Sequence, residues 1–178
     1  MRTWVALLRG INLGGHRKVS MPLLREALTK AGCTDVRTYV NSGNVVLRSA
    51  HARADDVSAA VHDVIAETFD LDVPVVVRTG SQLAEILDWN PFPEEAAARP
   101  NLVAVVHLVR KPPAAKVREL LATDVAPDRI AARGSEVVVA WSERTGGPLA
   151  DKALNALGVE GTARNWRTLT ALAGLTEE

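Results

Sequence analysis

The order of short apolar segments in the first 79 residues limits the fold of this chain more than any other feature. Residues 3–8 form an apolar run that predicts a buried strand. Apolar residues recur at helical spacing over residues 20–31 and 54–69, which predicts two amphipathic helices. Three further strands are predicted at residues 35–40, 45–48 and 73–78. This order, strand-helix-strand-strand-helix-strand, is that of a ferredoxin-like unit.

Residues 80–178 contain a second, incomplete version of the same order. They begin with a short predicted helix at 81–87 and an irregular stretch at 89–93. The remaining predictions are a strand at 102–109, a helix at 113–121, strands near 129–132 and 136–141, a helix at 148–157 and a last helix after Asn165. We therefore predict an α+β protein of two ferredoxin-like lobes, the second partial and followed by a C-terminal helix, with domains at residues 1–79 and 80–178.

The composition of the 178 residues is that of an ordinary globular protein. About half of them (47%) are hydrophobic and 24% are charged, which excludes collagen, coiled coils and disordered chains. The longest apolar run, residues 102–109, is far shorter than the roughly 20 residues of a membrane span, and residues 4–8 are too few for a signal-peptide core. Cys33 is the only cysteine, so no intramolecular disulfide can form. A cytoplasmic location without a membrane partner is the simplest expectation.

The charges of the chain sum to zero but are unevenly distributed. The first 50 residues hold 8 basic and 2 acidic residues, and the next 50 hold 3 basic and 10 acidic residues. Nucleic-acid binding over the whole surface needs an excess of positive charge, because released counterions drive it. The balance therefore argues against such a footprint and leaves room for a local anion site in the N-terminal part.

The predicted topology places two polar segments together. A right-handed first crossover makes the first two strands parallel, so the loop at residues 9–18 and the turn at residues 41–44 should emerge at the same end of the sheet. In the loop, a pair of glycines can turn backbone N–H groups toward one point, while Arg9 and Lys18 supply positive charge. This combination favours an anion-binding concavity. The alternative is a flexible loop whose glycines only accommodate positive φ.

Two further sets of polar residues could contribute to the same site. In the turn, Ser42 and Asn44 offer directional hydrogen bonds, although such residues also make an ordinary hairpin turn. At the predicted start of the last helix, Arg164 offers a cation, Asn165 an N-cap and Trp166 a flat stacking surface. The alternative there is a capped terminal helix with a packing tryptophan.

Four short motifs follow one another along the chain: LLRGINLGG at residues 7–15, TYVNSGN at 38–44, NPF at 90–92 and TARNW at 162–166. This ordered set resembles the domain-of-unknown-function family 1697. The resemblance implies a soluble, two-lobed α+β protein found mainly in bacteria, and it implies no established activity, cofactor or partner. The family pattern often has a lysine after the double glycine, where this chain has His16; Arg17 and Lys18 keep the positive charge.

The leading hypothesis is a pocket for a small anionic ligand that bears phosphate or carboxylate, formed by the loop, the turn and the helix start at Arg164. The candidate ligand-binding residues are Arg9, Asn12, Gly14, Gly15, Lys18, Tyr39, Ser42, Gly43, Asn44, Arg164, Asn165 and Trp166. No metal ligand or cofactor is expected, because the histidines and Cys33 lack metal-ligand spacing. Whether a reaction follows binding stays open, since Tyr39 and His16 are the only titratable candidates for a general base.

Two other functions remain as alternatives. The basic first 50 residues and the ferredoxin-like lobe fit a nucleic-acid-binding module, but the first lobe has few aromatic residues for stacking RNA bases: Trp4, Tyr39 and Phe69. The chain could also be a protein-interaction or adaptor subunit, which would require an exposed apolar patch.

Overall fold

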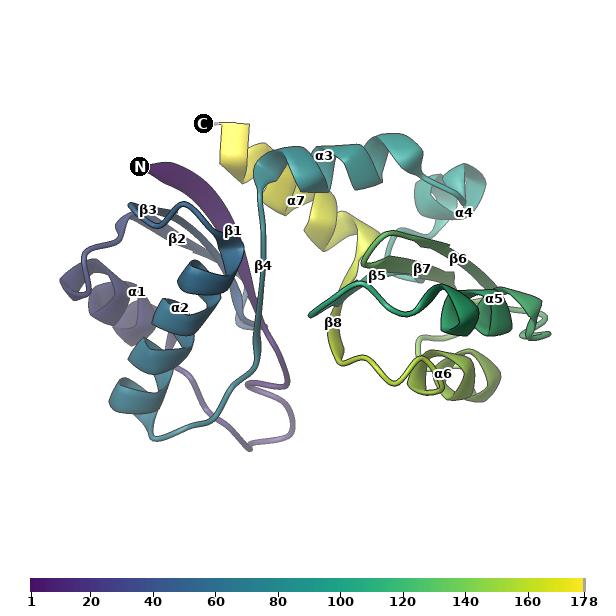
Figure 1. Ribbon diagram of the computed structural model, residues 1–178, viewed down its shortest axis with the longest axis horizontal. Coiled ribbons are helices and arrows are strands. Elements are labelled where there is room, and N and C mark those ends of the chain that lie inside the picture. The colour runs from purple at the N-terminus through teal and green to yellow at the C-terminus, as the bar shows by residue number, and fades with distance from the viewer. Residues whose placement is uncertain (178) are drawn as a thin grey trace. The chain divides into compact units, whose positions relative to one another are not determined.

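The computed structural model describes residues 1–177, which form two antiparallel sheets, each with its own helices (Figure 1). The first sheet comprises four strands: β1 (Arg2–Leu8), β2 (Thr34–Tyr39), β3 (Asn44–Ser49) and β4 (Val75–Arg78). Their spatial order is β2-β3-β1-β4, and β1 pairs antiparallel with both β3 and β4. Two helices follow β1 and β3: α1 (Met21–Lys30) and α2 (Ala54–Phe69). This is the predicted ferredoxin-like arrangement.

The core of the first sheet lies on the face that α1 and α2 cover. Side chains alternate along β1, so Trp4, Ala6 and Leu8 face this core. Apolar side chains at helical spacing meet them: Leu24 and Leu28 from α1, and Val57, Val61 and Ile65 from α2. Ser20 caps α1, as its side-chain oxygen accepts a hydrogen bond from the Leu23 N–H at 3.4 Å.

The second sheet also has four strands: β5 (Val103–Leu108), β6 (Arg129–Arg133), β7 (Glu136–Ala140) and β8 (Gly161–Asn165). Their order, β6-β7-β5-β8, repeats that of the first sheet. Two helices follow β5 and β7 and pack on one face of the sheet: α5 (Ala114–Ala122) and α6 (Pro148–Asn155). The second lobe is therefore a complete ferredoxin-like unit, where the sequence predicted a partial one.

Strand β8 is the element that makes the difference, because the sequence does not predict it. Its residues, GTARN, lack the apolar alternation of a strand. The strand is held by pairing with β5, in which Val105 lies opposite Arg164. A Cβ at Gly161 would lie 2.8 Å from the carbonyl oxygen of His107, so a glycine permits this close pairing. Tertiary pairing, not local pattern, forms this strand.

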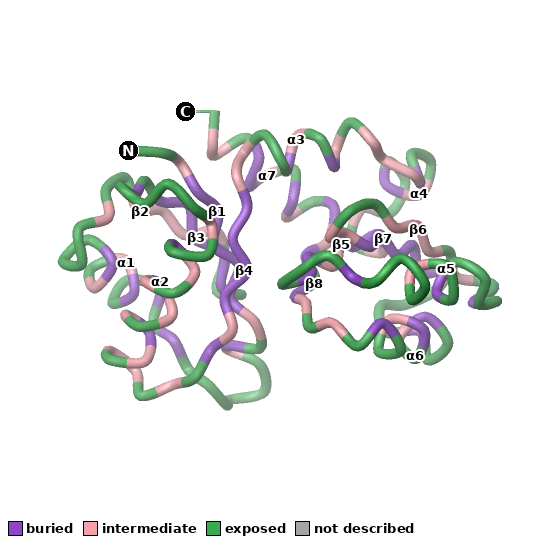
Figure 2. Tube along the Cα trace, in the orientation of Figure 1, coloured by how far each residue is buried: buried purple, intermediate pink, exposed green. Residues whose placement is uncertain are grey.

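Three further helices complete the fold: α3 (Gly80–Trp89), α4 (Pro93–Ala98) and α7 (Trp166–Glu177). Contacts group the described residues into two compact units, residues 1–85 with those from 171 onward, and residues 86–170, so α3 and α7 contribute to both. The predicted domain boundary between residues 79 and 80 stays a prediction. In each unit the central strands are mostly buried, β1 and β3 in the first and β5 and β7 in the second, whereas the edge strands β2 and β6 contain no buried residue (Figure 2). No helix within residues 1–177 is long and apolar enough to cross a membrane.

The turn between β2 and β3 contains a glycine that the packing requires. Gly43 has a φ of +79°, and a Cβ there would lie 2.7 Å from Leu8 Cβ and 3.0 Å from Ile11 Cδ1. The left-handed backbone and the close approach both disfavour a side chain. Gly15, in the loop after β1, has a similar φ of +83°, but a Cβ there would have no heavy atom within 4 Å. A comparison of alanine substitutions at the two glycines therefore separates the cost of backbone strain from the cost of steric contact.

We predict that Gly43→Ala destabilises the protein more than Gly15→Ala does. Both variants carry left-handed strain of about 1 kcal/mol. Gly43→Ala adds overpacking against Leu8 and Ile11, which costs about 1–3 kcal/mol. Urea unfolding of both variants measures the difference in the free energy of unfolding. Equal values would show that the turn has room for a side chain.

Candidate functional site

Three segments of the first unit meet at one end of its sheet. The loop after β1 contacts the β2–β3 turn, since the Leu8 N–H donates to the Gly43 carbonyl at 2.8 Å. It also contacts the α2–β4 connection, where the Arg9 N–H donates to the Pro74 carbonyl at 3.0 Å. Because β1 and β2 both run antiparallel to β3, the loop and the turn leave the sheet at the same end. The predicted meeting of the loop and the turn is confirmed.

The loop after β1 is itself a small hairpin. Leu13 and His16 form a bridge, with the His16 N–H donating to the Leu13 carbonyl at 3.1 Å. Gly14 and Gly15 stand at its tip with φ values of +57° and +83°. Two consecutive positive φ values are what a type I′ turn requires. The turn therefore explains the presence of both glycines without any ligand.

Asn12 holds this hairpin against its surroundings. Its backbone N–H donates to the Arg17 carbonyl at 3.1 Å. Its Nδ2 group donates to the Val19 carbonyl at 3.0 Å and to the Asn41 carbonyl at 2.7 Å, and its Oδ1 accepts from the Val19 N–H at 2.9 Å. Both amide hydrogens are used within the protein, so Asn12 positions the loop. One side chain thus joins the loop, the start of α1 and the β2–β3 turn.

A second amide side chain shapes the β2–β3 turn. Asn44 is fully buried, and its Nδ2 group donates to the Tyr39 carbonyl and to Ser42 Oγ, both at 3.0 Å. Tyr39 is half-buried, whereas Ser42 is exposed. Val40 is 55% exposed and has a φ of +49°, which is a strained conformation for a β-branched residue. The turn therefore presents Val40, Asn41 and Ser42 to solvent.

A hollow of about 540 Å³ opens between the loop, the turn and the start of α1. Its lining residues are Asn12, Gly15, Lys18, Val19, Ser20, Met21, Pro22 and Asn41. Val19 and Met21 are buried and form an apolar side, whereas Lys18 and Ser20 are exposed. Three of the predicted site residues, Asn12, Gly15 and Lys18, thus share this hollow.

The sequence did not predict the start of α1 as part of the site. Ser20 is recognisable as an N-cap, but its place in the same hollow as Asn41 depends on the Asn12 side chain, which no local pattern reveals. The remaining predicted residues of this unit belong to the same loop and turn: Arg9, Gly14, Tyr39, Ser42, Gly43 and Asn44. Gly43 and Asn44 have structural roles there, in packing and in shaping the turn.

The charge next to the hollow is positive. Residues 1–25 contain five Arg and Lys side chains and no Asp or Glu, and the first turn of α1 has no acidic residue. The positive end of the α1 dipole therefore lies close to Lys18, two residues before the N-cap. In the α2–β4 connection, Asp72 Oδ1 lies 2.9 Å from Nε2 of His62, and this hydrogen bond raises the pKa of His62. That carboxylate pairs with a histidine of α2.

The third predicted segment belongs to the second unit and differs from expectation. Arg164 lies within β8, not at a helix start, and its Nη1 group donates to Thr162 Oγ1 at 2.7 Å and to the Ala163 carbonyl at 2.8 Å. Arg164 is 8% exposed, and burial lowers its pKa to about 10, so it stays protonated at neutral pH. Asn165 caps α7 as predicted, since its Oδ1 accepts from the Thr168 N–H at 2.9 Å.

Trp166, the predicted stacking residue, begins α7. It is 8% exposed, and its backbone N–H donates to the Pro100 carbonyl at 3.1 Å. At this exposure the indole ring presents little surface to a ligand. Residues 164–166 and the hollow belong to different units, so their sharing of one pocket stays a prediction.

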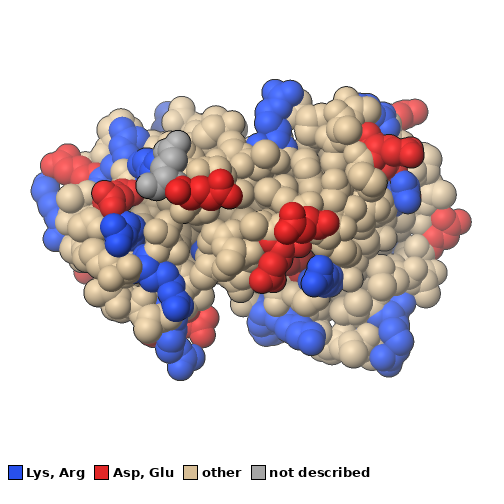
Figure 3. All heavy atoms as spheres, turned by 90° about the horizontal axis from the view of Figure 1, so that it is seen from above, with Lys and Arg blue, Asp and Glu red and all other residues tan. Residues whose placement is uncertain are grey.

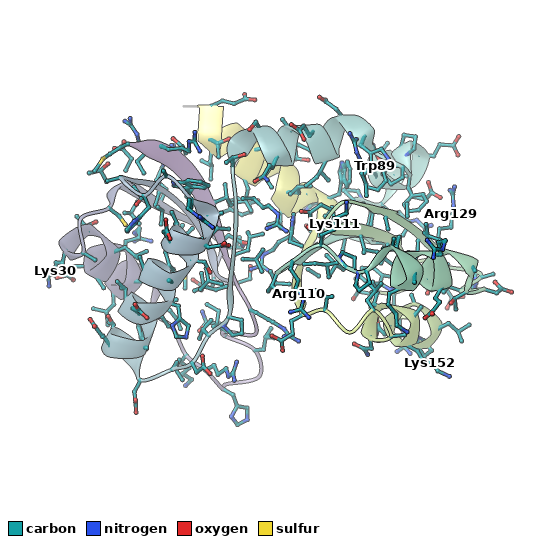
Figure 4. All side chains as sticks on the ribbon, in the orientation of Figure 1. Lys30, Trp89, Arg110, Lys111, Arg129 and Lys152 are labelled. Atoms are coloured by element: carbon teal, nitrogen blue, oxygen red, sulfur yellow. The ribbon has the colours of Figure 1, made fainter. Side chains whose placement is uncertain are left out.

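The second unit repeats the backbone pattern of the first at the end of its central strand. The Leu108 N–H donates to the Ser135 carbonyl at 2.9 Å, as the Leu8 N–H does to the Gly43 carbonyl. Lys111, labelled in Figure 4, lies between β5 and α5, in the same place along this lobe as Lys18 in the first. The second lobe therefore offers an internal comparison for the candidate site.

Other reactive groups are poor candidates for chemistry. Cys33 is half-buried, and burial raises the pKa of its thiol, which lowers its strength as a nucleophile at neutral pH. Within residues 1–177, no group of three His, Cys, Asp or Glu side chains could hold a metal ion.

We predict that Asn12→Ala lowers the free energy of unfolding by about 1–3 kcal/mol, because three hydrogen bonds are lost and backbone groups lose their partners. Hydrogen exchange of the Val19 amide should accelerate at the same time, since its acceptor is removed. Asn101→Ala is the control, because Asn101 is an exposed asparagine of the second unit. Unchanged exchange at Val19 in Asn12→Ala would contradict the role of Asn12 in closing the loop.

Comparison with known proteins bears on the whole fold. Residues 1–137 match the family model described as "Protein of unknown function (DUF1697)". The solved structure of the conserved bacterial protein SP0830 from Streptococcus pneumoniae is similar over 98% of both chains, with a TM-score of 0.74 and 19% sequence identity, which shows the fold alone. The search of curated proteins found no match. Because the family model covers most of the chain, including the loop, the turn and the start of α1, the protein belongs to DUF1697, a family of unknown function.

Proposed function

We propose that this protein binds a small ligand with a phosphate or carboxylate group in the hollow beside α1. The observation that carries this proposal is the exposed Lys18 near the start of a helix, in a hollow of about 540 Å³ whose lining residues include no Asp or Glu. This volume is within the range of small-molecule sites.

Electrostatics supports an anion at this point. A helix start carries a partial positive charge and a lysine beside it adds a full one, so the two together favour an anion. An acidic residue in the first turn would meet that charge, but α1 has none, and Arg17 and Lys18 precede its N-cap. A bound phosphate or carboxylate would be stabilised by the ammonium group and by the helix start together.

The nucleic-acid alternative has less support. Nucleic-acid binding depends on a continuous basic surface. On the face shown in Figure 3, basic and acidic side chains are interspersed, and the total charge of the chain is zero. With a single cysteine, the protein suits a reducing compartment such as the cytoplasm, where phosphorylated and carboxylated metabolites would be its candidate ligands.

We predict that Lys18→Ala weakens the binding of inorganic phosphate or citrate about tenfold, a loss of about 1.4 kcal/mol. Isothermal titration calorimetry of the wild type and the variant with both anions measures this effect. The matched control is Lys30→Ala: Lys30 lies at the opposite end of the same helix, exposed to solvent and paired with Glu26 at 2.8 Å (Figure 4). Such an exposed pair contributes little, so Lys30→Ala should bind as the wild type does.

Two results would overturn the proposal. One is that the wild type binds neither anion. The other is that Lys18→Ala and Lys30→Ala change the affinity equally. A mobility shift of single-stranded nucleic acid with a steep salt dependence would instead favour the nucleic-acid alternative.

A further inference from the structure

Exposed apolar side chains lie beside the residues that line the hollow. The large hydrophobic residues that are exposed in the described part of the first unit are Met1, Leu13, Leu23 and Val40. Except for Met1, each of them is the sequence neighbour of a lining residue: Asn12, Pro22 or Asn41. Three of these four exposed residues are thus next in sequence to residues of the hollow that holds Lys18 and the start of α1.

Hydrogen bonding brings two of these side chains onto adjacent backbone segments. Asn12 Nδ2 donates to the Asn41 carbonyl at 2.7 Å, which ties the residue before Leu13 to the residue after Val40. Leu13 is 66% exposed and lies in the hairpin whose tip is Gly14 and Gly15. Leu13 and Val40, 26 residues apart in the chain, are thus each next in sequence to one of two lining residues that a hydrogen bond joins.

Val40 also has a strained backbone conformation. Its φ of +49° is one that asparagine and glycine adopt with much less strain than a β-branched residue. With 55% of its surface exposed, Val40 gives the turn only limited packing in return. Strain of this kind is typical of functional positions, where the side chain has a use outside the fold.

We propose that the ligand of the hollow is an amphiphile, with an anionic group at Lys18 and the start of α1 and an apolar body against Leu13, Leu23 and Val40. This inference rests on the proposed function of the hollow. The volume of about 540 Å³ is more than a bare phosphate or carboxylate group fills, which leaves room for an apolar body along Val19, Met21 and Pro22, from which it would extend toward the exposed side chains. Each methylene group buried there should tighten binding about fourfold.

The test compares inorganic phosphate with hexyl phosphate, which carries the same anionic group on an apolar chain. We expect the wild type to bind hexyl phosphate at least about tenfold more tightly in isothermal titration calorimetry. The double variant Leu13→Ser with Val40→Asn should lose this difference and keep its affinity for inorganic phosphate. Asparagine suits the left-handed backbone at position 40, so the fold should tolerate the change. Leu121→Ser, which alters an exposed leucine of the second unit, is the control.

Equal affinities of the wild type for the two phosphates, with Lys18 still required, would overturn the amphiphile and leave the proposed function intact. No binding of either compound would overturn both. Sedimentation with phosphatidylglycerol vesicles then identifies the source of the amphiphile. If the protein co-sediments with the vesicles and this requires Leu13 and Val40, the amphiphile is a lipid of a bilayer. If the protein binds hexyl phosphate but does not co-sediment, the amphiphile is a free molecule.

Discussion

The central position of β1 in the first sheet is the constraint on which the rest of this unit depends. The strand is paired with β3 on one side and with β4 on the other, and its residues from Val5 to Leu8 are almost completely buried. The chain can leave such a strand only at the end of the sheet, beside the β2–β3 turn and the segment before β4. The contact of Gly43 with Leu8 shows how closely the loop and the turn approach each other there. The place of the candidate site is thus a consequence of sheet order.

The polar groups at this end of the sheet have two different tasks. The amide side chains of Asn12 and Asn44 hydrogen-bond to backbone carbonyls and hold the loop and the turn in place. Such bonds are favoured because buried backbone groups are costly when they lack partners. Arg17 and Lys18 are exposed instead, next to a helix that has no acidic residue in its first turn. The first set holds the loop and the turn in place, and the second supplies the charge that the proposed anion would meet.

Much of the first unit could be predicted from the sequence, because each element shows its own period, as in the spacing of Val57, Val61 and Ile65 along α2. Strand β8 could not be predicted, since its five residues take their structure from pairing with β5. In the site, topology alone predicts that the loop and the turn meet. The roles of individual residues depend on side-chain hydrogen bonds between segments that are far apart in the sequence. Asn12 donates to the Asn41 carbonyl, and this contact brings the β2–β3 turn to the hollow at the start of α1.

Backbone amide shifts in an NMR titration with inorganic phosphate test the central claim most directly, because they locate an anion residue by residue. We expect saturable shifts at Gly15, Lys18, Val19 and Asn41 and in the first turn of α1, the residues that line the hollow. The corresponding segment of the second lobe, around Lys111, should show none. Shifts that spread over all exposed basic residues, or that are largest in the second lobe, would contradict an anion site at the start of α1.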